Sequence, residues 1–365
     1  MTFLDIRLSE YLRTHKKEPA EAVGVAALSG DASTRRYTRL IGPSGTAMLM
    51  DAPRTAESPP CPPDASPEQR AALGWNAVSR LAASRVEAFA AVAELLSGYG
   101  LSAPAIYGVD VEAGYAIVED LGDALFARVI ETGENETRLY EAAAEALAVV
   151  HARTCPSGLN APGGAWPLLD YDAVALAANA DLFVEWIGKA VPDVVIDAPA
   201  RARWEALRDQ LVDAAMAFPR VLTIRDYHAE NLIWLPERGG VRRVGLLDFQ
   251  DAVRGWRAWD FAMLLQDARR DVSPDAAEAA LARYFALTGA PEAAFREELA
   301  ILGALNALRI LGIFSRLVAR DGKARYRGFM PREWGHLARG LDHPALAAMK
   351  DFVTAIAGAH LQASP

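Results

Sequence analysis

The sequence predicts an α+β protein with two unequal parts, a small antiparallel sheet around one main helix and a larger, mostly helical part. Three observations support this prediction. The first 120 residues alternate short strand-like runs with turns, the sequence after Gly122 becomes alanine-rich with a helical period, and a hairpin flanked by polar residues interrupts the helical part. We therefore expect two lobes, residues 1–121 and 122–365.

Local patterns predict each element of the first lobe. Apolar side chains repeat at a helical period in residues 3–15 and again in 84–99, where glycines follow that would end a helix. Six prolines between Pro53 and Pro67 predict a loop. Short apolar runs bounded by turn formers predict five strands, at 23–28, 37–41, 47–50, 105–109 and 115–119.

Helical periodicity dominates the second lobe. The most apolar stretch, 299–314, is shorter than the roughly 20 residues that cross a bilayer and contains Asn306 and Arg309, so it predicts a buried helix and no membrane association. Two strand-like runs, 232–235 and 244–247, predict a hairpin inside this lobe. The expected helices are 141–151, 173–191, 200–218, 275–287 and 291–319.

Composition excludes several classes of protein. With 52 % hydrophobic and 23 % charged residues, the chain can bury a large core and is not disordered. A net charge of −9 argues against a nucleic-acid binder. Two cysteines, Cys61 and Cys155, are too few for a disulfide framework or a cysteine-rich zinc site, and the first residues lack the apolar run of a signal peptide. A cytoplasmic protein is expected.

Polar residues at the open end of the predicted hairpin are the strongest functional signal. Asn231 precedes the first strand and Asp248 follows the second, so the hairpin places an amide oxygen beside a carboxylate. Such oxygen ligands suit Mg²⁺. Asp226, five residues before Asn231, is then placed to act as a base for an incoming hydroxyl. Each residue alone would be an ordinary turn former or cap, and only their joint order favours a catalytic loop.

This order resembles a known signature. Asp226-x-x-x-x-Asn231, a hairpin and then Asp248-Phe are similar to the motifs of protein kinases and of their small-molecule relatives, the aminoglycoside phosphotransferases and choline kinases. The resemblance implies a protein-kinase-like bilobal fold with ATP and Mg²⁺ as cofactors. It implies that Asp226 accepts the proton of the substrate hydroxyl, while Asn231 and Asp248 hold Mg²⁺ on the phosphates. Asp260 resembles the aspartate that braces the catalytic loop by hydrogen bonds.

The resemblance also implies nucleotide contacts in the first lobe. The polar turn between the first two strands takes the place of the phosphate-covering loop, where the hydroxyls of Ser33 and Thr34 and the backbone N–H groups would contact phosphate oxygens. The segment after the last strand fits the hinge between the lobes. There the carbonyl of Glu119 and the amide of Leu121 would contact adenine.

One departure from the family concerns its phosphate-binding lysine. Met50 stands at that position in the third strand, and we expect Arg35 or Arg36 to supply the missing positive charge. Glu87 and Glu94 are candidates for the helix carboxylate that usually pairs with the lysine, or belong to a solvated helix face. The departure leaves open a nucleotide-binding protein without transfer activity.

A wider similarity points to one branch, the anomeric sugar kinases of bacterial cell-wall recycling, which phosphorylate N-acetylmuramate and N-acetylglucosamine at C1. It implies an amino sugar as the small-molecule partner, in recycling toward UDP-N-acetylmuramate, and an aminoglycoside or other small-alcohol phosphotransferase remains the alternative. A monomer is expected. The segments that carry this similarity are 31–39, 50–53, 118–123, 225–232, 247–253 and 264–271.

Substrate contacts are expected near and after the metal-binding aspartate. The lactyl carboxylate of muramate calls for a bidentate arginine, and Arg269 and Arg270 are the candidates, although a basic helix end that faces water has the same appearance. Gln250, Asp251 and Asp267 are the candidates for the sugar hydroxyls or the acetamido group.

Overall fold

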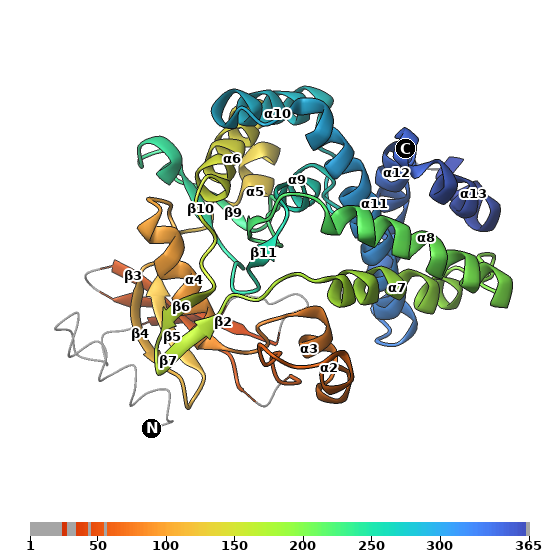
Figure 1. Ribbon diagram of the computed structural model, residues 1–365. Coiled ribbons are helices and arrows are strands. Elements are labelled where there is room, and N and C mark those ends of the chain that lie inside the picture. The colour runs from red at the N-terminus through yellow and green to blue at the C-terminus, as the bar shows by residue number, and fades with distance from the viewer. Residues whose placement is uncertain (1–23, 28–33, 43–44, 55–56, 363–365) are drawn as a thin grey trace.

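The computed structural model describes residues 24–27, 34–42, 45–54 and 57–362, so the predicted helix 3–15 lies outside the described residues. A five-stranded antiparallel sheet forms the first lobe, and all five predicted strands are confirmed (Figure 1). Its strands, in spatial order, are β1 (Gly24–Ala27), β2 (Arg36–Gly42), β3 (Gly45–Asp51), β5 (Tyr115–Glu119) and β4 (Ile106–Asp110).

The predicted helix 84–99 is α4 (Val86–Gly98), and its apolar stripe is buried in the main core. Phe89 of this helix stacks on Phe249, with 4.8 Å between the ring centroids. Because Phe249 directly follows Asp248, this contact fixes the predicted metal-binding segment against the first lobe.

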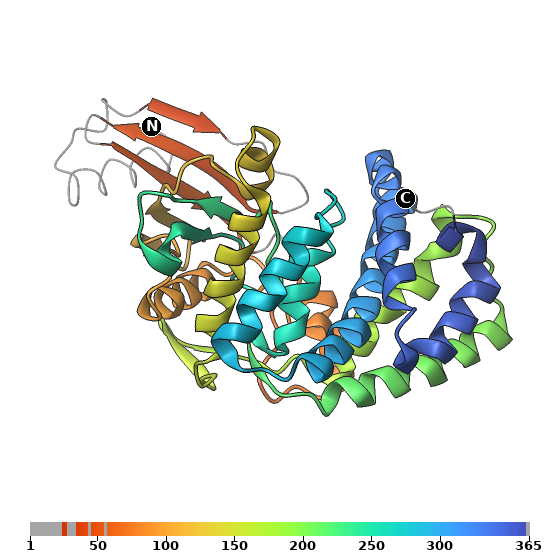
Figure 2. The same cartoon turned by 90° about the horizontal axis from the view of Figure 1, so that it is seen from above.

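Helices dominate the second lobe (Figures 1 and 2). The five predicted helices are confirmed within a few residues, as α6 (Glu136–His151), α7 (Ala173–Ala190), α8 (Ala198–Met216), α10 (Pro274–Thr288) and α11 (Glu292–Ala319). The sequence patterns missed four others, α5 (Phe126–Glu131), α9 (Arg257–Leu265), α12 (Met330–Gly340) and α13 (Ala347–Gln362).

Helix α11 is long and apolar enough to span a membrane, but 72 % of its most apolar window is buried inside the protein. It packs on α7, α9 and α12 and is a core helix, as the sequence predicts. Gly312 allows the close approach to α7, because a Cβ atom there would lie only 2.3 Å from the carbonyl carbon of Leu182.

Two short antiparallel pairs carry the polar loops. The predicted hairpin is confirmed as β9 (Leu232–Trp234) paired with β10 (Val244–Leu246). A second pair, β8 (Val221–Thr223) with β11 (Val253–Gly255), was not expected. These pairs place residues 224–231 and 247–252 side by side, since each loop runs between one strand of each pair.

The two lobes exchange elements. The segment after the proline-rich loop forms α2 (Pro67–Leu73) and α3 (Trp75–Ser79), and α3 packs on α7 of the second lobe. In return, the hairpin of β6 (Gly158–Ala161) and β7 (Gly164–Pro167) packs on α4. The sequence patterns predict neither of these two contacts. The division into lobes at residues 121 and 122 stays a prediction, and it does not account for the elements that pack on the opposite lobe.

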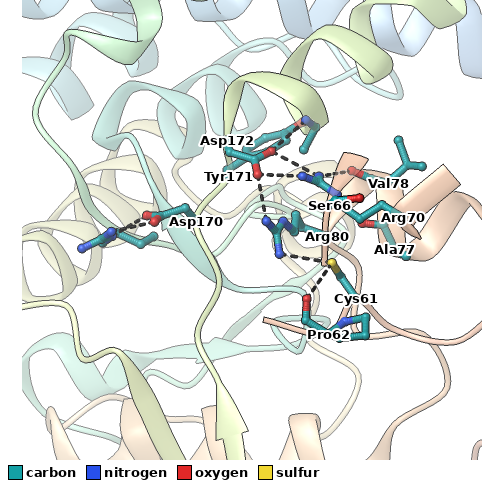
Figure 3. Close-up of polar contacts among 12 residues, drawn as sticks. Cys61, Pro62, Ser66, Arg70, Ala77, Val78, Arg80, Asp170, Tyr171 and Asp172 are labelled. Carbon is teal, nitrogen blue, oxygen red and sulfur yellow. Dashed lines mark hydrogen bonds and ion pairs between the residues drawn. The ribbon is translucent and has the colours of Figure 1, made fainter. Parts of the chain in front are cut away.

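Charged contacts hold α2 and α3 in place. Arg70 is 2 % exposed and donates to Asp172 over 2.7 Å, and Arg80 donates to the same carboxylate over 2.8 Å (Figure 3). Asp172 also caps α7 by accepting from the Ala175 N–H. Arg80 further contacts Cys61 Sγ at 3.1 Å, which ties the proline-rich loop to the same point.

Candidate active site

The loop between β8 and β9, residues 224–231, is held by a buried carboxylate. Asp260, on α9, is fully buried and accepts hydrogen bonds from the backbone N–H groups of Ile224 and Arg225, each at 2.9 Å. Arg225 has φ +77°, a left-handed conformation that costs energy for a side chain of this size. The two hydrogen bonds stabilise that conformation and orient the residue that follows, Asp226.

Asn231, at the end of the same loop, uses its amide nitrogen within the protein. Nδ2 donates to the Asp226 carbonyl over 2.9 Å and lies 3.2 Å from His228 Nε2. The amide oxygen is therefore the group that is left to reach a ligand. The Leu247 N–H donates to the Asn231 carbonyl over 2.9 Å, so the following residue, Asp248, lies beside Asn231.

Electrostatics link the carboxylates of the two loops. Burial first, then the negative charge of Asp248 and, to a smaller extent, that of Asp251, together raise the pKa of Asp226 to about 6. Arg309 and Arg225 act in the opposite direction. The structure thus brings together the three residues that the motif singles out, although Asp226 and Asp248 are far apart in sequence.

Asp248 begins the loop between β10 and β11 and has φ +54°, another left-handed conformation. Its Oδ1 accepts from Gln250 Nε2 over 3.0 Å and lies 3.2 Å from a guanidinium nitrogen of Arg35. Arg36 points elsewhere, because it is 75 % exposed and pairs with Asp51 at 2.8 Å. Of the two arginines proposed to replace the lysine, only Arg35 reaches the site.

The position of the missing lysine is apolar. Met50 is fully buried, and its sulfur accepts from the Tyr37 hydroxyl over 3.4 Å. Glu87 pairs with Arg54 at 3.2 Å, and Glu94 is exposed, so neither fills the role of the usual helix carboxylate.

Of the two hydroxyls expected to contact phosphate, that of Ser33 lies outside the described residues. The Thr34 hydroxyl donates to the Glu57 carboxylate and lies 3.1 Å from Ser84 Oγ, so it belongs to a polar cluster beside the proline-rich loop.

The segment after β5 forms the connection between the lobes. The Glu119 side chain pairs with Arg238 at 2.6 Å, and Leu121 joins a buried apolar cluster with Ile233 and Leu235. Arg39 donates to Asp120 over 2.7 Å and to Asp123 over 2.8 Å, which fastens β2 to this connection.

An open cavity extends from Asp226 into the interior of the second lobe. It includes Asp267 and Arg269, two of the predicted substrate contacts, and also Arg309 of α11, which in the sequence only interrupts an apolar helix. The remaining lining residues are His228, Met263, Gln266, Ala268, Ile310, Ile313 and Phe314.

Three of the expected substrate contacts lie elsewhere. Arg270 pairs with Glu136 at 2.7 Å and donates to the Tyr140 hydroxyl over 2.7 Å, so its charge is already compensated. Gln250 bridges Asp248 and Asp251, and the Asp251 carboxylate accepts from the Ala82 N–H over 2.5 Å. Gln250 and Asp251 therefore brace the predicted metal-binding loop and are not among the residues that line this cavity.

The fold and the site define the class of protein. A small antiparallel sheet sits on a larger helical lobe, and a base candidate lies beside an Asn–Asp pair, as in a protein-kinase-like phosphotransferase. A sequence model of the phosphotransferase enzyme family matches residues 24–299, and the chain belongs to this family.

Two curated relatives carry the same name. An N-acetylmuramate/N-acetylglucosamine kinase of Caulobacter vibrioides is 52 % identical over 327 residues, which is 89 % of each chain. A protein of that name from Pseudomonas putida is 30 % identical and covers 96 % of this chain and 94 % of its own.

Solved structures confirm the fold. A choline/ethanolamine kinase family protein from Mesorhizobium loti matches with a TM-score of 0.58 at 17 % identity, over 100 % of this chain and 99 % of its own. An ADP-bound aminoglycoside phosphotransferase matches with a TM-score of 0.51 at 12 % identity, over 91 % and 99 % of the two chains.

Proposed function

We propose that the protein is an ATP-dependent sugar kinase that transfers the γ-phosphate to the anomeric C1 hydroxyl of N-acetylmuramate and N-acetylglucosamine. The relative of that name that is 52 % identical over 89 % of both chains carries the proposal. A role in peptidoglycan recycling toward UDP-N-acetylmuramate, a cytoplasmic location and a monomeric state belong to the same proposal. The two free cysteines fit a reducing compartment.

Asp226 is the proposed base. A pKa of about 6 leaves the carboxylate ionised in about nine tenths of the molecules at pH 7, and still basic enough to accept a proton. An anomeric hydroxyl is more acidic than an ordinary alcohol, so a carboxylate suffices. The cavity next to Asp226 provides the room for the acceptor.

Asn231 and Asp248 are the proposed ligands of Mg²⁺. Among the residues that the structure describes, no group of three or more His, Cys, Asp or Glu side chains forms a metal site. An amide oxygen and one carboxylate fit a Mg²⁺ ion that takes its other ligands from phosphates and water. When bound, the ion would neutralise charge on the transferring phosphate.

The nucleotide would lie against the first lobe. Arg35, 3.2 Å from Asp248, is the proposed replacement for the lysine, and Ser33 and Thr34 remain proposed phosphate contacts. The Glu119 carbonyl and the Leu121 amide are the proposed contacts to the adenine edge. The apolar cluster that Leu121 joins supports this proposal, because small-molecule pockets are lined mainly by apolar side chains.

Incubation with Mg·ATP and a panel of acceptors tests the function. We expect α-1-phosphates of N-acetylmuramate and N-acetylglucosamine by ³¹P NMR, and no product from kanamycin, choline or homoserine. Arg269 and Arg309 in the cavity would repel a cationic aminoglycoside. Product from kanamycin alone would refute the proposal, and ATP binding without any product would indicate an inactive nucleotide-binding protein.

A further inference from the structure

Two guanidinium groups face the acceptor cavity without a counter-ion. Among the described residues, no carboxylate lies within 4.0 Å of Arg269 or Arg309, whereas Arg270, Arg257 and Arg332 nearby all form ion pairs. Arg269 is exposed at the cavity, while Arg309 lies deeper on α11.

The hydrogen-bond and ring contacts of Arg309 among the described residues are all to neutral groups. Its Nε donates to Asn306 Oδ1 over 3.0 Å, a second nitrogen lies 3.7 Å from Met263 Sδ, and the guanidinium carbon lies 5.5 Å from the centre of the Trp259 ring. Burial lowers the pKa of Arg309, which reflects the cost of a charge removed from water. Such a charge is usually matched by an anion.

The nearby acid Glu333 does not provide that anion. Glu333 is fully buried and neither of its oxygens has a hydrogen-bond partner among the described residues. Burial, followed by the charge of Asp267, raises the pKa of Glu333 well above its usual value, which disfavours its ionised form. Asp226 and Asp267 also line the cavity, but among the described residues neither forms an ion pair with Arg309 within 4.0 Å, so the guanidinium is available to an anionic group of a ligand.

We propose that Arg309 and Arg269 together bind a carboxylate of the acceptor, which is the lactyl carboxylate of N-acetylmuramate. This inference rests on the proposed function. The guanidinium of Arg309 can present two parallel N–H groups to a carboxylate. Arg269, at the exposed side of the cavity, would then shield the bound carboxylate from water. The pair therefore selects the acidic sugar over the neutral one.

The same cavity holds acceptors for the uncharged part of a sugar. Asp267 is 3 % exposed and its Oδ2 is buried without a hydrogen-bond partner among the described residues, as is Gln266 Oε1. These atoms are matched to hydroxyl and acetamido N–H donors. Gly303 leaves room for the Gln266 amide, since a Cβ atom there would lie 2.7 Å from Nε2. Both sugars share these donors, so only the arginine pair distinguishes them.

Steady-state kinetics with both sugars test the proposal. We expect Arg309→Met to lower the ratio of kcat/KM for N-acetylmuramate to that for N-acetylglucosamine about 10- to 100-fold, mainly through KM for N-acetylmuramate; the loss of its charge beside Asp226 acts on both sugars and cancels in this ratio. Arg269→Met should act in the same direction with a smaller factor because its position is exposed. Arg270→Met, which removes a neighbouring arginine outside the cavity, is the matched control and should leave the ratio of the two sugars unchanged.

The methyl ester of N-acetylmuramate supplies a test that needs no variant. For wild-type protein, kcat/KM should be lower for the ester than for the acid, by the same factor by which Arg309→Met lowers kcat/KM for the acid relative to N-acetylglucosamine. For the variant, kcat/KM should be the same for acid and ester. If Arg309→Met fails to fold, the ester and the surface variant Arg269→Met decide the question. An equal loss on both sugars would overturn the inference while leaving the proposed function intact. A wild-type protein that phosphorylates neither sugar would overturn both.

Discussion

Replacing Asp226 by asparagine removes one negative charge from the candidate site and keeps the shape of the side chain. The structure raises the pKa of Asp226 from 3.8 to about 6, chiefly by burial and then by the charge of Asp248. The folded protein therefore binds this proton more tightly than the unfolded chain. Above pH 6 the ionised carboxylate destabilises the fold, and this cost disappears as the pH falls toward 4.

The difference between the two pKa values corresponds to about 3 kcal/mol at most. Asp226 is half-buried, and contact with water reduces the effect, so we expect about 1–3 kcal/mol. Asp226→Asn should thus be more stable than wild type at pH 7.5 and no more stable at pH 4. Its turnover should fall about 10²- to 10⁴-fold, the usual contribution of a general base, while ATP binding persists.

Urea denaturation without Mg²⁺ at both pH values measures the stability term, and a coupled ADP assay measures turnover. Asp213→Asn, at an exposed position of α8, is the matched control and should change the free energy of unfolding by less than about 0.5 kcal/mol. Equal or lower stability of Asp226→Asn at pH 7.5 would show that the carboxylate is well solvated. Retained turnover would exclude Asp226 as the base.

Three further substitutions test other parts of the structure. Arg35→Met should raise KM for ATP and lower turnover at least about tenfold. Arg36→Met, which removes the exposed pair with Asp51, should change both constants less than about twofold. Equal effects of the two substitutions would contradict the proposal that Arg35 replaces the lysine. Asp172→Ala should lower the free energy of unfolding, measured in urea, by about 3–5 kcal/mol, because it leaves the buried guanidinium of Arg70 without its counter-ion. A loss below about 1 kcal/mol would show that this ion pair does not stabilise the fold. Gly312→Ala should lower Tm strongly by a clash with α7, while Gly98→Ala, which meets open space, should not.

Local sequence was sufficient to predict the β9–β10 hairpin that is flanked by the candidate metal ligands. Asn231 and Asp248 flank two short apolar strands, and pairing those strands brings the two residues together whatever the rest of the chain does. The long helices were predictable for a similar reason, because their apolar period extends over several turns.

Contacts between distant segments were not predictable from local patterns. Asp172 meets Arg70 and Arg80 across 102 and 92 residues, and the sequence around it indicates only a helix cap. Arg309 reaches the cavity because α11 packs across the second lobe, whereas its sequence context indicates a single charge in an apolar helix. Arg270, adjacent to a cavity residue, turns instead to Glu136.

The exchange of elements between the lobes limits how the cleft can open. Because α3 rests on α7 and the β6–β7 hairpin rests on α4, pulling the lobes apart would break both contacts as well as bend the connection after β5. Strands β1 and β2, at one side of the sheet, are held among the described residues by strand pairing, by the Arg39 bonds and by the Arg35–Asp248 pair just before β2, whereas Met50 of β3 belongs to the main core. We therefore expect the outer strands β1 and β2 to bend when nucleotide binds or leaves. The α3–α7 contact and the contact of the β6–β7 hairpin with α4 should stay intact during this motion.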